Sequence, residues 1–160
     1  MKELFTALQH KFMNEVKKKP FFDTCFFFYM FEHKKELERA EKMKEIYLTS
    51  FNVQEILYKE DNVGHNIKHE IRKFLKDNKD KIKVVDVDVF PGNVEREKEF
   101  VNNIDENILK HIEDASDAVL LAIAIKTEST IYTRDKHHLF NADLENYVNE
   151  KGVKVLNTIE

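Results

Sequence analysis

The sequence is poor in the features that mark secreted and membrane proteins. Its single cysteine, Cys25, cannot form a disulfide within the chain, as is usual in a reducing cytoplasm. The longest apolar run, residues 118–125, is far shorter than the roughly 20 residues that cross a bilayer. The amino-terminal stretch is charged and lacks the apolar centre of a secretory signal. We therefore expect a cytoplasmic protein without a membrane partner.

Glycine is scarce, with three residues, and positive charge is not in excess, since the formal net charge is −4. A biased genome and a hot habitat are alternative explanations for few glycines among many Lys, Glu, Ile and Phe residues. The charge argues against a protein that coats nucleic acid nonspecifically, because such binding depends on Lys and Arg displacing counterions. It leaves room for a nucleic-acid enzyme, because metal-binding carboxylates make the sum negative.

What is present describes an ordinary globular protein. The chain is 42% hydrophobic and 35% charged, and its 160 residues suffice for one domain with a sizeable core. No internal repeat, linker or low-complexity segment divides it. We expect a helical extension over residues 1–19 and a single folded domain over residues 20–160.

The most informative stretch is residues 111–140. An almost wholly apolar helix is predicted over residues 115–126 and a β-branched strand over 130–133. An apolar helix that leads into a short strand is typical of a mostly parallel sheet with both faces covered. Asp117 lies in the first turn of this helix and Asp135 just past the strand, where α/β sheets place their ligands.

Two further segments carry structural predictions. Apolar residues at helical spacing predict that residues 2–17 form a helix that packs on the domain, or alternatively on a second copy of the chain. Residues 82–90 alternate Val and Asp, which predicts a half-exposed edge strand with Asp86 and Asp88 facing outward.

Several acidic residues have two interpretations each. Asp23 interrupts an aromatic run, where an isolated charge is costly unless it is paired or bound to a metal, but it also suits the cap of the following helix. Glu55 is either a solvated surface residue or a site carboxylate. Asp117 stands three residues after Asp114, as the acid of a capping box would.

The order of strands, helices and acids resembles the PIN domain, a family of metal-dependent ribonucleases that includes the VapC-type toxins. The matching segments are Phe-Asp-Thr at Asp23, Thr-Ser-Phe-Asn-Val-Gln-Glu-Ile at Glu55, Asp-Ala-Val-Leu-Leu-Ala-Ile-Ala at Asp117 and Tyr-Thr-Arg-Asp-Lys-His-His at Asp135. The resemblance covers about residues 20–157. It implies a three-layer α/β/α, Rossmann-like fold with a central, mostly parallel sheet of about five strands, to which the amino-terminal helix is an addition.

The resemblance also implies a site. Asp23, Glu55, Asp117 and Asp135 would converge at the carboxyl edge of the sheet and bind Mg²⁺ or Mn²⁺, while Thr133 would support the last acid and an attacking water. Oxygen ligands suit these hard cations, which lower the pKa of a bound water and offset charge on the leaving oxygen. Carboxylates this close repel one another, so without metal some should have raised pKa values.

RNA also requires positive charge near this edge. We expect Arg134 and Lys136 to contact the substrate, and we regard His137 and His138 as surface residues or substrate contacts, because adjacent histidines make a poor chelating pair. Further basic candidates are Lys34, Lys35, Arg39 and Lys42.

Three functions follow from these features. The first is a ribonuclease that hydrolyses RNA phosphodiester bonds, as the toxin of a toxin–antitoxin pair with a protein antitoxin and as a homodimer. The second is a non-catalytic PIN-like module that binds RNA or a protein. The third is a different Rossmann-like metal hydrolase that acts on small phosphates.

Overall fold

The computed structural model describes residues 1–134 and 142–160, and these residues contain one parallel sheet of six strands. The strands are β1 (Gln9–Phe12), β2 (Pro20–Phe22), β3 (Ile46–Thr49), β4 (Ile82–Asp86), β5 (Thr130–Tyr132) and β6 (Lys154–Leu156). They lie in the order β1-β4-β3-β2-β5-β6. Every neighbouring pair is parallel, so the carboxyl ends of all six strands share one edge.

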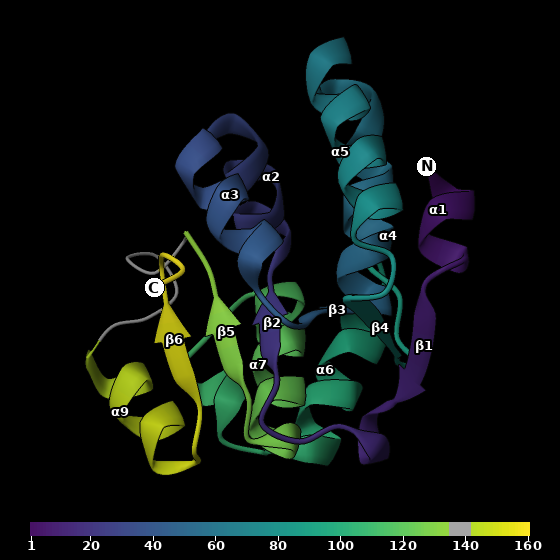
Figure 1. Cartoon of the computed structure of the whole chain (residues 1–160). Helices are drawn as coiled ribbons and strands as arrows, with labels where there is room; N and C mark the ends of the chain where they lie inside the picture. Colours follow the sequence, from purple (N-terminus) through teal and green to yellow (C-terminus); the bar gives the residue numbers. More distant parts are fainter. Residues whose placement is uncertain (135–141) are drawn as a thin grey trace.

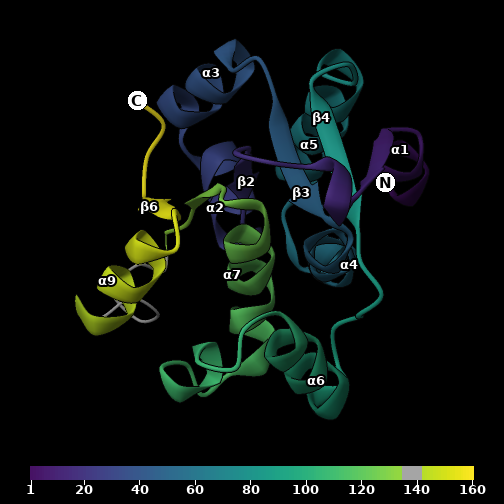
Figure 2. The same cartoon turned by 90° about the horizontal axis from the view of Figure 1, so that it is seen from below.

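Helices cover both faces of this sheet, as Figures 1 and 2 show. They are α1 (Lys2–Thr6), α2 (Thr24–Glu32), α3 (Lys34–Lys42), α4 (Ser50–Lys59), α5 (His65–Asp77), α6 (Val94–Ile104), α7 (Ala115–Thr127) and α9 (Ala142–Glu150). Short 3₁₀ turns follow β1, α4 and α6, at Met13–Glu15, Glu60–Asn62 and Ile108–Lys110. None of the described helices is long and apolar enough to cross a membrane.

The core is divided in two by the sheet, because successive side chains of a strand point to opposite faces. Phe21 packs in the cluster formed with α6, α7 and α9. Its neighbour Phe22 packs in the cluster formed with α1, α2 and α5. Seen from below, α6 and α7 lie on one side of the sheet, and α3 and α5 on the other (Figure 2). The protein is therefore a three-layer α/β/α structure, as expected.

Helix α7 is buried on nearly all sides. Nine of its residues are buried, among them Leu121 at 1% exposure and Ala122 and Ile123 at 0%. It packs against the sheet on one side and against α6 on the other. A helix that is apolar all round is expected in such a position, so the prediction for residues 115–126 is confirmed within one residue.

The amino-terminal segment differs from its prediction. The helix expected over residues 2–17 ends at Thr6, and Gln9–Phe12 is instead the strand β1, which pairs with β4 in parallel. The prediction for residues 82–90 is confirmed in part, because Ile82–Asp86 is a strand and Asp86 and Asp88 are exposed, but its edge position was wrong, because β1 covers the outer side of β4 and makes it an internal strand. The backbone groups along that side of β4 need partners, and β1 supplies them. The division of the chain at residues 19 and 20 stays a prediction.

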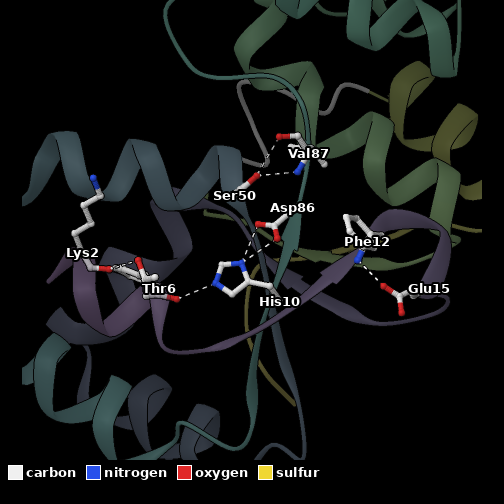
Figure 3. Close-up of polar contacts among 9 residues, drawn as sticks. Lys2, Thr6, His10, Phe12, Glu15, Ser50, Asp86 and Val87 are labelled. Carbon is white, nitrogen blue, oxygen red and sulfur yellow. Dashed lines mark hydrogen bonds and ion pairs between the residues drawn. The ribbon is translucent and has the colours of Figure 1, made fainter.

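A side-chain contact accompanies this pairing (Figure 3). Nδ1 of His10 in β1 lies 2.9 Å from a carboxylate oxygen of Asp86 in β4, and Nε2 of His10 lies 3.2 Å from the carbonyl oxygen of Phe5. The charge of Asp86, which looks like protection of a free edge in the sequence, thus has a partner on the neighbouring strand. Nearby, the Ser50 hydroxyl at the start of α4 accepts from the backbone N–H of Val87 at 2.9 Å.

Candidate functional site

Three helices begin at the carboxyl edge of the sheet, and each has a side-chain cap. Asp23 follows β2 and accepts from the backbone N–H of Phe26 at 2.7 Å. Thr49 ends β3 and accepts from the backbone N–H of Asn52 at 3.0 Å. Asp114 accepts from the backbone N–H of Ser116 at 2.9 Å and caps α7. Polar side chains gather here because helix starts leave backbone N–H groups that need acceptors.

These starts surround a cavity of about 110 Å³. The side chains that line it include Asp23, Thr24, Asn52, Glu55, Asp117 and Thr133. Three of the four predicted site acids and the predicted threonine, which come from four separate parts of the sequence, therefore share one cavity. The fourth acid, Asp135, lies outside the described residues. That the lining acids act as a catalytic or metal site stays a prediction.

Both interpretations of Asp23 are compatible with the structure. Its side chain caps α2, and the same residue lines the cavity. Its backbone N–H donates to the carbonyl oxygen of Tyr132 at 3.1 Å, which ties the end of β2 to β5. Next to it, the backbone N–H of the buried Thr133 donates to the carbonyl oxygen of Leu156 at 2.8 Å. Backbone pairing thus sets where Asp23 and Thr133 stand.

Glu55 is the acid whose surroundings the structure shows in most detail. Its Oε1 accepts from the Thr24 hydroxyl at 2.8 Å and from the Asn52 side-chain amide at 3.0 Å. The same Asn52 amide donates to the Thr24 hydroxyl at 3.1 Å. Burial raises the pKa of Glu55, while the hydrogen bonds from Thr24 and Asn52 oppose that rise. The main cause is therefore loss of water, and the charge of Glu97 adds a smaller upward contribution.

Asp117, which also lines the cavity, is in the first turn of α7 and is exposed. Asp114 caps α7 by accepting from the backbone N–H of Ser116, and the side chain of Asp117 takes no part in that hydrogen bond. The residue between them, Ser116, also lines the cavity and donates its hydroxyl to Oε1 of Glu97 at 2.8 Å.

Sequence reasoning missed the polar residues that support the acids. Glu97 in α6 is only 1% exposed, and its Oε2 accepts from the backbone N–H of Gly92 at 3.0 Å. Thr24 and Asn52 hold Glu55, and Lys59 lines the cavity one helical turn after it. The signals available in the sequence were the threonine directly after Asp23 and the i, i+3 spacing of Asn52 and Glu55.

Of the predicted substrate contacts, the structure describes Arg134, which directly follows the cavity residue Thr133. Arg134 is exposed and follows Thr133 directly, but its guanidinium lies 4.1 Å from the centre of the Tyr29 ring, and its Nη1 donates to the carbonyl oxygen of Asn157 at 2.7 Å. Three of the four basic candidates, Lys34, Lys35 and Arg39, line a second groove together with Arg134. Lys136, His137 and His138 lie outside the described residues.

Comparison with known proteins shows similarity to solved structures. No family model matches the chain, and no curated protein matches it in sequence. A chain in the crystal structure of DNA-bound VapBC from Salmonella typhimurium has a similar structure, with a TM-score of 0.55 and 12% identity. The similarity covers 86% of this protein and 96% of that chain. This protein has a PIN-like fold.

The donor set of the PIN-like cavity suits a hard cation. The polar atoms that line it include carboxylate, hydroxyl and amide oxygens, the type of ligand that Mg²⁺ and Mn²⁺ prefer. Within residues 1–134 and 142–160, no three His, Cys, Asp or Glu side chains gather closely enough to hold a metal ion. Mg²⁺ does not require three, because it keeps several waters and is held by one or two carboxylates.

Proposed function

We propose that the protein is a ribonuclease that hydrolyses RNA phosphodiester bonds with the help of Mg²⁺ or Mn²⁺. The observation that carries the proposal is the common cavity of Asp23, Glu55, Asp117 and Thr133 at the carboxyl edge of the sheet. Asp135 would complete the ligand set from the end of β5. Helix capping accounts for Asp23, but it gives no reason for Glu55 and Asp117 to line the same cavity, since their charges would repel.

Each residue has a role in this proposal. Asp23, Asp117 and Asp135 hold the cation, which when bound supplies a Lewis acid and a water of lowered pKa. Glu55 contributes a further carboxylate oxygen, and Thr24 and Asn52 fix its orientation. Its raised pKa makes it a better proton acceptor than a solvated glutamate. The Thr133 hydroxyl supports Asp135 and the attacking water.

The decisive test compares two aspartates that are three residues apart. Asp117→Asn keeps the size of a cavity side chain but removes its charge, and we expect cleavage of RNA with Mn²⁺ to fall at least about 100-fold, because a ligand of the catalytic cation is lost. Asp114→Asn is the matched control, because asparagine caps a helix as well as aspartate does. Its cleavage rate should stay close to that of the native protein. Cleavage by Asp117→Asn at the native rate would refute the proposal.

A specific observation favours a second candidate, a non-catalytic PIN-like module that binds RNA or a protein. Two of the aspartates at this edge, Asp23 and Asp114, are engaged as helix caps. Titration calorimetry with Mn²⁺ distinguishes the two functions. Heat of binding that disappears in Asp117→Asn supports the enzyme, and absence of both binding and cleavage supports the module.

The structural neighbour is part of a VapBC complex, and on that basis we propose that this protein is the toxin of a toxin–antitoxin pair in the cytoplasm, with a protein antitoxin as partner and a homodimer as the free form. Expression of the native protein in bacteria should arrest growth, and expression of Asp117→Asn should not. Growth arrest by both proteins to the same extent would show that the toxicity does not depend on Asp117 in the cavity. Light scattering of the purified protein tests the dimer.

A further inference from the structure

A second groove, of about 410 Å³, lies at the carboxyl ends of β5 and β6. Its lining includes Tyr29, His33, Lys34, Lys35, Arg39 and Arg134. These residues come from the end of α2, the start and middle of α3 and the segment after β5. The carboxyl-terminal residues pass beside α3, as both views show (Figures 1 and 2).

This groove is positive, although the whole chain has a net charge of −4. Its one lining carboxylate, Glu36, is 4% exposed and is already engaged. Glu36 forms an ion pair of 3.1 Å with Arg39 and accepts from the backbone N–H of Ile159 at 3.1 Å. Lys34 and Lys35 are exposed, and no carboxylate of the described residues forms an ion pair with either. Their charges therefore face solvent together with that of Arg134.

Arg134 is held in place before any ligand binds. Its guanidinium lies on the Tyr29 ring, and that ring is in turn stacked on His33 with a centroid distance of 3.8 Å. Within the described residues, the Arg134 guanidinium donates one hydrogen bond, from Nη1 to the carbonyl oxygen of Asn157. This bond uses one of the five N–H donors of the guanidinium. A planar, fixed guanidinium with further donors is well suited to a phosphate, because it can bind two oxygens at once.

Two segments of the chain connect the groove with the acidic cavity. Thr133 lines the cavity, and the next residue, Arg134, lines the groove. Helix α2 also connects them, from Asp23 at the cavity to Tyr29 at the groove. Six residues of helix correspond to about 9 Å. For a strand that stays stacked, with the rise of about 3.4 Å per nucleotide of a duplex strand, this is the length of roughly two to three nucleotides.

We propose that this basic groove binds the phosphate backbone of a single RNA strand, roughly two to three nucleotides from the bond in the acidic cavity. The proposal rests on the proposed function, since it assigns the cavity to the cleaved bond. The groove would add affinity without regard to base identity, because phosphate contacts position a strand but do not specify its sequence.

Binding without metal tests the groove separately from cleavage. The probe is a fluorescent single-stranded RNA of about 12 nucleotides in EDTA, and the readout is the dissociation constant from anisotropy at several salt concentrations. The variant is Lys34→Ala/Lys35→Ala, and the matched control is Lys76→Ala/Lys79→Ala. Lys76 and Lys79 are also exposed but lie just before β4, at the opposite edge of the sheet.

We expect the groove variant to bind RNA roughly tenfold or more weakly at about 0.1 M salt, with a salt slope smaller by about 1.4. The control variant should bind as the native protein does. Arg134→Ala should weaken binding as well, and Arg134→Lys should restore only part of it, because lysine lacks the planar fork. If the native protein cleaves RNA, the groove variant should raise KM and leave kcat nearly unchanged.

Native affinity in the groove variant would overturn the proposal, as would an equal loss in the control variant. A poly(glutamate) peptide whose binding depends on Lys34 and Lys35, while RNA binding does not, would assign the groove to an acidic protein instead. The experiments distinguish an error in the groove proposal from an error in the proposed ribonuclease function. Metal-free RNA binding that depends on Lys34 and Lys35, without cleavage in Mn²⁺, contradicts the ribonuclease alone.

Discussion

Replacement of Glu55 by glutamine should remove the proposed RNA cleavage activity and at the same time stabilise the folded protein at neutral pH. Glutamine keeps an oxygen that can accept from Thr24 and Asn52, so the hydrogen bonds at Oε1 are preserved. What it removes is the ability to ionise. Burial raises the pKa of Glu55 in the folded state, so folding favours the protonated carboxyl over the charged one.

The sign and size of the effect follow from proton linkage. Below the pKa of the unfolded state, about 4.3 for glutamate, both states are protonated and the contribution of Glu55 to stability is fully present. Between that value and the higher folded pKa, the folded state retains a proton that the unfolded state has lost. Stability therefore falls as pH rises, by at most about 1.4 kcal/mol for each pH unit. Above the folded pKa the loss is complete.

Urea unfolding in EDTA between pH 4 and pH 8 measures this difference. For a urea m-value of about 2 kcal/mol/M, the midpoint of the native protein should fall by up to about 0.7 M for each pH unit in that window, relative to Glu55→Gln. The control is Glu38→Gln at an exposed position in α3, which should follow the native curve. Parallel pH curves for the native protein and Glu55→Gln would show that the environment of Glu55 does not disfavour its charge.

Two other substitutions test the packing around the cavity. Asn52→Ala should destabilise the fold by about 2–4 kcal/mol, because two hydrogen bonds inside a buried network are lost together with the acceptor for the buried Thr49 hydroxyl; an unchanged urea midpoint would contradict the network. Leu121→Ala in α7 should cost about 2–5 kcal/mol through the cavity that it leaves. The exposed Lys126→Ala on the same helix should change stability by less than about 0.5 kcal/mol, and equal effects of the two would show that α7 is not packed as described.

The central helix and strand of the fold are visible in the sequence because their physical signals are local. Helix α7 is apolar on all sides, and β5 follows it after a short turn, so burial on both faces could be predicted directly. Strand β1 lacks such a signal. Its four residues are mostly exposed and do not alternate, and its conformation depends on the unpaired side of β4, which is more than 60 residues away in the chain.

The candidate site also contains both residues that the sequence reveals and residues whose position depends on contacts between distant segments. That Asp23, Glu55 and Asp117 come to one place could be predicted from the resemblance of their order to that of the PIN domain, and the structure places all three in the lining of one cavity. The buried Glu97 could not, because it stands between Glu95 and Glu99 on a highly charged helix, and nothing in the sequence distinguishes it from these two. Only the packing of α6 against the start of α7 brings Glu97 to Ser116.

The strand order also has a consequence for how the protein folds. Strand β2 pairs Phe21 with Tyr47 on one side and with Ile131 on the other, so its second partner is synthesised late. Parallel pairings over such sequence separations close long loops and form slowly compared with local helical contacts. During synthesis, Asp23 and Glu55 would therefore be present for some time before Asp117 and Thr133 complete the lining of the cavity. If the protein is the proposed ribonuclease, the nascent polypeptide should not cleave RNA until β5 pairs with β2.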